Sequence, residues 1–335
     1  METEQRQDER SQSGEFHLLT DLTGHFSEMA ISERKFLDNL IRSHRPAKVL
    51  EVGVAAGASS AIMLNAMRDN PDARLYSIDF MTPYYKDNSK KTGFLCQELM
   101  GDETKKWTLY TGDLTYKFMD EIGDGIDFCL LDASHSLPGE VLDFLMILPY
   151  LAKNAVIVIH DLALFQSLKY ITPDASPLVI TNAIACRLLY SVLQGEKMMP
   201  AKDPEWIMAN MGAVRLEDDP AGRILDLFSL LGIPWHNNFE VVNSLQAMRG
   251  FVLRHYGEEY ATMFSNILAF QQEAKQKNDN EWNYSQKGRF ASRQIEHIEK
   301  MSLMKVLKSL LFPWYVYKNY RLTKALVRYF AQNGA

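Results

Sequence analysis

Residues Lys48–Ser60 read Lys-Val-Leu-Glu-Val-Gly-Val-Ala-Ala-Gly-Ala-Ser-Ser. The apolar start of this stretch predicts a buried strand, and the residues from Ala58 onward begin a helical pattern. Between the two stand Gly53 and Gly57, and glycine is favoured where a chain turns tightly or where another group approaches its backbone. The stretch therefore predicts the first strand, turn and helix of an α/β protein.

Four more apolar segments follow, and each ends in or next to a polar or acidic residue. We expect strands over residues 74–79, 107–111, 126–132 and 155–161. Short, continuously apolar strands that alternate with helices are typical of a parallel sheet covered on both faces. The predicted fold class is α/β, a doubly wound, mostly parallel Rossmann-like sheet with helical additions on its N- and C-terminal sides.

The composition is that of a globular protein of a reducing compartment. The chain has 335 residues, of which 47% are apolar and 23% charged, enough to bury a large core. Its cysteines, Cys96, Cys129 and Cys186, form no Cys-x-x-Cys pair, so we expect neither a disulfide framework nor a structural zinc site. No segment reaches the roughly 18 apolar residues of a transmembrane helix. We therefore expect a cytoplasmic protein.

Changes in composition divide the chain into five parts. The α/β pattern and the irregular region after it form one domain, which we place at residues 46–260. We also expect a disordered lead-in at residues 1–15, a helical cap at 16–45, a helical and polar connector at 261–300 and a pair of basic amphipathic helices at 301–335. Residues 274–286 are so polar that we expect a linker or an exposed turn there.

Two acidic residues at strand ends are candidates for binding a nucleotide-like cofactor. Asp79 ends the second strand, where an acid can accept hydrogen bonds from both hydroxyls of a ribose. Asp113 follows the third strand, where an acid can hold an adenine amino group. NAD and S-adenosylmethionine proteins both use such an acid, and an ordinary surface position is the alternative for each. An NAD site also predicts a Gly-x-Gly-x-x-Gly turn, but Ala55 stands where its second glycine belongs.

The ends of the fourth and fifth predicted strands carry a second polar cluster. Asp132 and His135 leave the fourth strand, and His160 and Asp161 leave the fifth. Because neighbouring strands lie roughly 5 Å apart, Asp132, His160 and Asp161 can converge on one divalent cation, with His135 at its rim. Carboxylates favour magnesium or manganese, whereas histidine favours a transition metal. The alternative for His160 is a buried histidine that only satisfies its neighbours.

With these motifs in order, residues 47–162 resemble the class I S-adenosylmethionine-dependent methyltransferases. The nearest resemblance is to the branch of macrolide-sugar O-methyltransferases and cephalosporin-hydroxylase-like proteins. The motifs are Glu51–Ser60 (EVGVAAGASS), Ser77–Phe80 (SIDF), Gly112–Leu114 (GDL), Leu130–Ser136 (LLDASHS) and Val156–Asp161 (VIVIHD). More faintly, Gly195–Lys197 and Asn210–Ala213 resemble segments of members found in bacterial polysaccharide clusters, which implies polysaccharide biosynthesis.

The resemblance implies how S-adenosylmethionine would bind. Glu51, Gly53 and Gly57 would shape the pocket for its methionine and ribose parts. Asp79 would bind the ribose hydroxyls, and Asp113 would lie near the adenine.

The resemblance also implies the chemistry of the second cluster. Asp132 and Asp161 would be metal ligands, with Mg²⁺ as the expected ion, and His135 would be the general base. His160 stands where some relatives have glutamate, and we expect it as the third ligand. The implied function is metal-assisted O-methylation of a sugar, a nucleotide sugar or a lipid-linked glycan. The alternatives are a non-catalytic partner or assembly module with the same fold and an NAD-dependent oxidoreductase.

The C-terminal residues have a different character from the acidic body. Residues 302–330 interleave apolar, aromatic and basic side chains, and Pro313 predicts a break into two helices. Aromatic and basic residues together suit an anionic membrane surface, so peripheral contact with the inner face of the membrane is one expectation. Packing on the body or on a second copy in a homo-oligomer is the alternative. The acidic body argues against nucleic acid as a partner.

Overall fold

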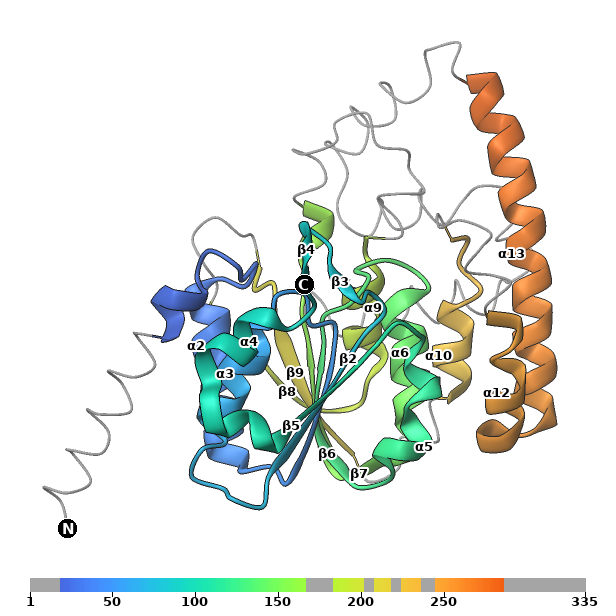
Figure 1. The fold of residues 1–335 in the computed structure, drawn as a ribbon. Helices are drawn as coiled ribbons and strands as arrows, with labels where there is room; N and C mark the ends of the chain where they lie inside the picture. Colours follow the sequence, from blue (N-terminus) through green and yellow to red (C-terminus); the bar gives the residue numbers. More distant parts are fainter. Residues whose placement is uncertain (1–18, 167–182, 202–207, 218–223, 236–244, 286–335) are drawn as a thin grey trace, which may run out of the picture.

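A seven-stranded sheet forms the centre of the protein (Figure 1). The computed structural model describes residues 19–166, 183–201, 208–217, 224–235 and 245–285. The strand order is β5-β2-β1-β6-β7-β9-β8. The strands are β1 Lys48–Val52, β2 Arg74–Asp79, β5 Trp107–Thr111, β6 Ile126–Leu131, β7 Leu151–Ile159, β8 Gly195–Met198 and β9 Gly212–Leu216.

The first five strands are parallel, and β9 is antiparallel to both β7 and β8. The predicted α/β class and the predicted parallel strands are therefore confirmed. Because β1 lies between β2 and β6, the direction of winding reverses beside it, and the carboxyl ends of β1 and β6 border the crevice where such sheets bind ligands.

Helices cover both faces of the sheet, as its apolar strands require. The described helices are α2 Ile31–His44, α3 Ala58–Ala66, α4 Phe94–Met100, α5 Met119–Ile122, α6 Gly139–Ile147, α9 Ala185–Val192, α10 Ile224–Leu230, α12 Arg249–Tyr256 and α13 Glu258–Ser285. Successive side chains of a strand point to opposite faces. Accordingly Val49 packs in a core with α2 and α3, whereas Leu50 packs in a second core with α6, α9 and α13. In Figure 1 these two groups of helices lie on opposite sides of the sheet.

The polar stretch expected to be a linker is helical instead. Helix α13 continues to Ser285, so the prediction for residues 274–286 is wrong over most of its length. The prediction relied on the high polarity of the stretch, but the Ala, Lys and Gln residues at its start have high helix propensity. Ala261, Phe264 and Leu268 bury the first turns of α13 against the body, and this packing supports continuation of the helix.

An insertion between β2 and β5 was not predicted from the sequence. It begins with an antiparallel hairpin of β3 Pro83–Tyr84 and β4 Asp87–Lys91. The polar sequence of β4 lacks the apolar alternation by which a strand is recognised. Figure 1 shows the hairpin beyond the carboxyl edge of the sheet, above β2.

Several predicted parts lie outside the described residues. These are the lead-in at 1–15, the basic segment at 301–335 and all of residues 286–300. Within the ranges that the structure describes, no helix is long and apolar enough to cross a membrane.

Candidate active site

The turn after β1 is where the two predicted glycines lie. Gly53 has φ +94°, and a Cβ atom at this position would lie 1.9 Å from the carbonyl oxygen of Asp132. Gly57 has φ +90° and begins α3, and its Cβ would lie 2.9 Å from that of Cys96. Both positions therefore require glycine because the protein packs closely around them. Their contact with a cofactor stays a prediction.

Glu51 lies behind this turn and is completely buried. Its carboxylate accepts hydrogen bonds from the hydroxyls of Ser59, Ser60 and Ser77, at 2.5, 2.6 and 2.6 Å. Burial raises the pKa of Glu51 to about 7, although the three hydroxyls oppose the shift. Glu51 thus ties β1 to α3 and β2, and it shapes the turn from the inside.

Asp79 holds the outer side of the same turn. Its Oδ2 atom accepts the backbone N–H groups of Val54 and Ala55, each at 2.9 Å, and its Oδ1 atom accepts that of Met81 at 2.7 Å. Since a carboxylate offers about four acceptor positions, three are used within the protein. Asp113 is exposed beyond β5 at the same edge of the sheet. Contact of either residue with a nucleoside stays a prediction.

The ends of β6 and β7 bring the second predicted cluster together. His135 Nδ1 lies 3.0 Å from Asp161 Oδ2 and 3.9 Å from Asp132 Oδ1. His160 Nδ1 lies 2.9 Å from Asp132 Oδ1 and 3.5 Å from Asp161 Oδ1. The predicted convergence of all four residues is therefore present in the structure.

His160 is enclosed by carboxylates on both sides of its ring. In addition to Asp132 at Nδ1, its Nε2 atom lies 3.3 Å from Glu33 Oε2, which comes from α2. Burial lowers the pKa of His160, but the carboxylates of Asp132 and Asp161 outweigh it and hold the pKa well above its usual value. Both ring nitrogens have hydrogen-bonding neighbours, so ligation of a metal by His160 would require the ring to release Asp132. That ligation stays a prediction.

The donors that fit a divalent cation are Asp132, Asp161 and His135. One ligand atom from each lies within 4.8 Å of the other two. His135 Nδ1 is buried, and the carboxylate oxygen Asp161 Oδ2 lies 3.0 Å from it. Two carboxylate oxygens and an imidazole nitrogen suit a divalent cation. The structure thus places His135, rather than His160, as the third possible donor.

Backbone strain is concentrated at the same edge. Among the described non-glycine residues, five have positive φ, and three of them, Ala55, His135 and Asp161, lie at strand ends of this site. Left-handed backbone is unfavourable for residues with a Cβ atom and persists where the surroundings enforce it. At His135 the enforcing contact is the backbone N–H, which donates to Glu140 Oε1 at 2.5 Å.

Three buried residues of the site were missed by sequence reasoning. Glu33 contacts His160, and Glu140 contacts His135. Asn210, which precedes β9, donates from Nδ2 to Asp161 Oδ1 at 2.9 Å and accepts the backbone N–H of Ala163. For Asn210 the faint resemblance of residues 210–213 was a usable signal. Glu33 has none, because its partner is 127 residues away.

Comparison with known proteins matches the central part of the chain to one family model. Residues 50–162 match the family model described as a methyltransferase domain, and this segment runs from β1 to just beyond β7. Among curated proteins, none matches the sequence. The family match and the sheet together indicate a methyltransferase domain between residues 50 and 162.

Solved structures of O-methyltransferases have a similar fold. One is TomG of Streptomyces achromogenes in complex with S-adenosylmethionine, with 14% identity and a TM-score of 0.44 over 60% of this chain and 89% of that one. Another is an O-methyltransferase of Bacillus cereus in complex with S-adenosylhomocysteine, with 14% identity and a TM-score of 0.44 over 60% and 90% of the two chains. At these values the similarity carries no argument about the substrate.

Proposed function

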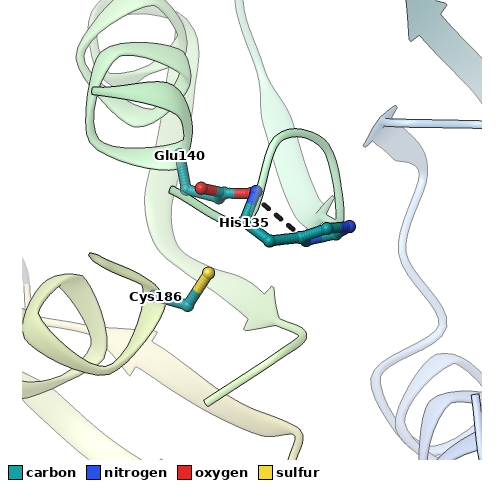
Figure 2. Close-up of side chains that lie close together, drawn as sticks. All are labelled: His135, Glu140 and Cys186. Atoms are coloured by element: carbon teal, nitrogen blue, oxygen red, sulfur yellow. Dashed lines mark hydrogen bonds and ion pairs between the residues drawn. The ribbon is translucent and has the colours of Figure 1, made fainter. Parts of the chain in front are cut away.

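We propose that this protein transfers the methyl group of S-adenosylmethionine to a hydroxyl group of a sugar or glycan. The observation that carries the proposal is the orientation of His135. Its Nδ1 atom faces Asp161, while Figure 2 shows the other ring nitrogen pointing away from Glu140 and Cys186. A histidine held by a carboxylate at one nitrogen is oriented to accept a proton at the other.

In the proposed reaction the hydroxyl oxygen of the acceptor attacks the methyl carbon as the carbon–sulfur bond breaks. The hydroxyl proton passes to Nε2 of His135, and S-adenosylhomocysteine leaves. Because the sulfonium methyl group is already activated, the main task of the protein is to align donor and acceptor. Asp161 and Glu140 keep the imidazole in place during the proton transfer.

The donor would bind at the turn between β1 and α3. Gly53 and Gly57 keep this turn free of side chains, and Asp79 has one acceptor position left for a ribose hydroxyl. Asp113 would lie near the adenine. TomG, which has a similar fold, has been solved with S-adenosylmethionine.

The cation of the proposal is Mg²⁺, held by Asp132 and Asp161. When bound, such an ion lowers the pKa of a coordinated hydroxyl and offsets the negative charge beside His135. Burial lowers the pKa of His135, whereas Asp132, Asp161 and Glu140 raise it, and the net direction is upward. His160 keeps Asp132 oriented from the buried side.

The sugar or glycan acceptor rests on the resemblance to the macrolide-sugar branch and to members from polysaccharide clusters. Residues 302–330, with their basic and aromatic side chains, are our proposed contact with a membrane that presents a lipid-linked acceptor. Cytoplasmic location and a homo-oligomer remain proposals of the same kind.

The test is a screen for methyl transfer from labelled S-adenosylmethionine to nucleotide sugars, glycans and lipid-linked glycans, with Mg²⁺ and with chelator. We expect label in a sugar hydroxyl with the wild-type protein. With His135→Ala we expect a rate lower by about a hundredfold or more, while S-adenosylmethionine still binds. Binding of the donor without transfer to any acceptor would favour a non-catalytic module.

A further inference from the structure

A second group of metal-binding side chains lies on the inner side of His135. His135 leaves β6, Glu140 lies in the first turn of α6, and Cys186 lies in the first turn of α9. One ligand atom from each lies within 4.8 Å of the other two. Figure 2 shows the sulfur of Cys186 directed towards the Glu140 carboxylate and His135. Unlike the Asp132 and Asp161 pair, this group contains a thiol.

The group includes a buried polar atom that the protein leaves unsatisfied. Glu140 is completely buried, and its Oε1 atom accepts the backbone N–H of His135. Its Oε2 atom has no hydrogen-bond partner among the described residues. His135 Nδ1 lies 3.5 Å from Glu140 Oε1 and 3.0 Å from Asp161 Oδ2. Buried polar groups without partners are uncommon because each costs free energy that a bound ligand recovers. The Oε2 atom of Glu140 therefore points to a ligand at this position.

We propose that His135, Glu140 and Cys186 form a binding site for a thiolate-binding divalent transition metal ion, with Zn²⁺ as the physiological ion. Imidazole nitrogen, carboxylate oxygen and thiolate sulfur are the ligand types of zinc, and three protein ligands leave a fourth position open. Mg²⁺ prefers oxygen ligands and remains at Asp132 and Asp161. Binding would release the thiol proton of Cys186 to solvent.

The site was hidden from sequence reasoning by its spacing. A structural zinc site is recognised from cysteines or histidines a few residues apart, whereas Glu140 and Cys186 come together only when α6 and α9 pack on the same face of the sheet. His135 is about one third exposed, whereas Glu140 and Cys186 are buried.

The consequence for activity rests on the proposed function. A neutral imidazole has one nitrogen with a free electron pair, so a metal ion bound at Nδ1 leaves the proton on Nε2. His135 then cannot accept a proton from the acceptor. Zn²⁺ at this site would therefore inhibit methyl transfer that Mg²⁺ supports.

Binding is tested with Co²⁺, which replaces Zn²⁺ and gives a charge-transfer absorption band when a thiolate is a ligand. Metal-free full-length protein is titrated with Co²⁺. We expect a thiolate band that saturates at one equivalent, disappears on addition of Zn²⁺ and is unaffected by Mg²⁺. Cys186→Ser removes the band, whereas the matched buried-thiol variants Cys96→Ser and Cys129→Ser keep it.

A further variant covers the case in which Cys186→Ser does not fold. Glu140→Gln keeps an acceptor for the His135 N–H and should keep the thiolate band, with affinity for Co²⁺ lower by about tenfold or more. Absence of the band in the wild-type protein, or its persistence in folded Cys186→Ser, would overturn the proposal. Unchanged Co²⁺ affinity in Glu140→Gln would also contradict it.

The activity measurement separates this proposal from the proposed function. If Co²⁺ binds through Cys186 but no acceptor is ever methylated, the metal site stands and the function falls. If methyl transfer occurs but no metal binds at Cys186, the function stands and the metal site falls. If both hold, Zn²⁺ inhibits at concentrations that fill the site, and Cys96→Ser remains equally sensitive to it.

Discussion

The Nε2 atom of His160 lies 3.3 Å from the Oε2 atom of Glu33, so helix α2 contacts the end of β7 directly. The same carboxylate oxygen accepts the backbone N–H of Ala30 at 2.7 Å and thereby caps α2. One buried side chain thus fixes both the start of the N-terminal helix and the ring that orients Asp132. The helical cap is therefore part of the candidate site.

Removal of Glu33 should destabilise the protein. Glu33→Ala removes the carboxylate beside Nε2 of His160 and also removes the cap of α2. We therefore expect the free energy of unfolding to fall by about 2–4 kcal/mol. Glu33→Gln keeps the acceptor for Ala30 and should lose less. Urea unfolding of the three proteins measures the difference, and equal midpoints for wild type and Glu33→Ala would contradict this account.

Burial of Glu51 should make stability depend on pH. Because the folded protein raises its pKa from 4.5 to about 7, folding favours the protonated form. This contribution to stability is present below the unfolded pKa and is lost as the pH rises through about 7. Between pH 5 and pH 8 the wild-type protein should lose about 2.5 kcal/mol relative to Glu51→Gln. Parallel pH profiles for the two proteins would show that Glu51 is not responsible.

The stability cost of a steric clash at Gly53 can be measured separately from the cost of its positive-φ backbone. Gly53→Ala combines a left-handed φ with a Cβ atom 1.9 Å from the carbonyl oxygen of Asp132, and we expect a loss of at least about 3 kcal/mol. Gly125→Ala is the matched control, since Gly125 has φ +86° and no atom within 4 Å of its Cβ position. It should lose only about 1–2 kcal/mol. Thermal unfolding gives both values, and similar losses would mean that the turn moves to relieve the contact.

The Asp79 carboxylate should matter more for cofactor binding than that of Asp113. Asp79→Asn removes a charged acceptor from the Val54 and Ala55 N–H groups and from the proposed ribose position, so affinity for S-adenosylmethionine should fall by roughly tenfold to a hundredfold. Exposed Asp113→Asn should have a smaller effect. Calorimetric titration of both variants checks the order, and the reverse order would place the nucleoside elsewhere.

The sheet and the polar residues at its strand ends could be predicted from the sequence for a simple physical reason. Strands buried on both faces are continuously apolar, and the parallel connection brings their carboxyl ends to one edge, where Asp79, Asp132 and Asp161 lie. Sequence reasoning missed the polar strand β4 and the polar C-terminal half of α13, whose residues carry no apolar periodicity.

The partners within the site were harder to predict than the site itself. Glu33, Glu140 and Asn210 are polar residues in ordinary sequence surroundings, and only tertiary packing brings each beside His160, His135 or Asp161. The same packing explains why His160 lies beside three carboxylates rather than open to solvent.

The central claim is that the edge formed by β1, β2 and β6 binds S-adenosylmethionine. The most direct test is calorimetric titration of the full-length protein with S-adenosylmethionine and, separately, with NAD, each with Mg²⁺ and with chelator. We predict binding of S-adenosylmethionine with a micromolar Kd and no binding of NAD. Binding of NAD instead, or of neither compound, would contradict the account.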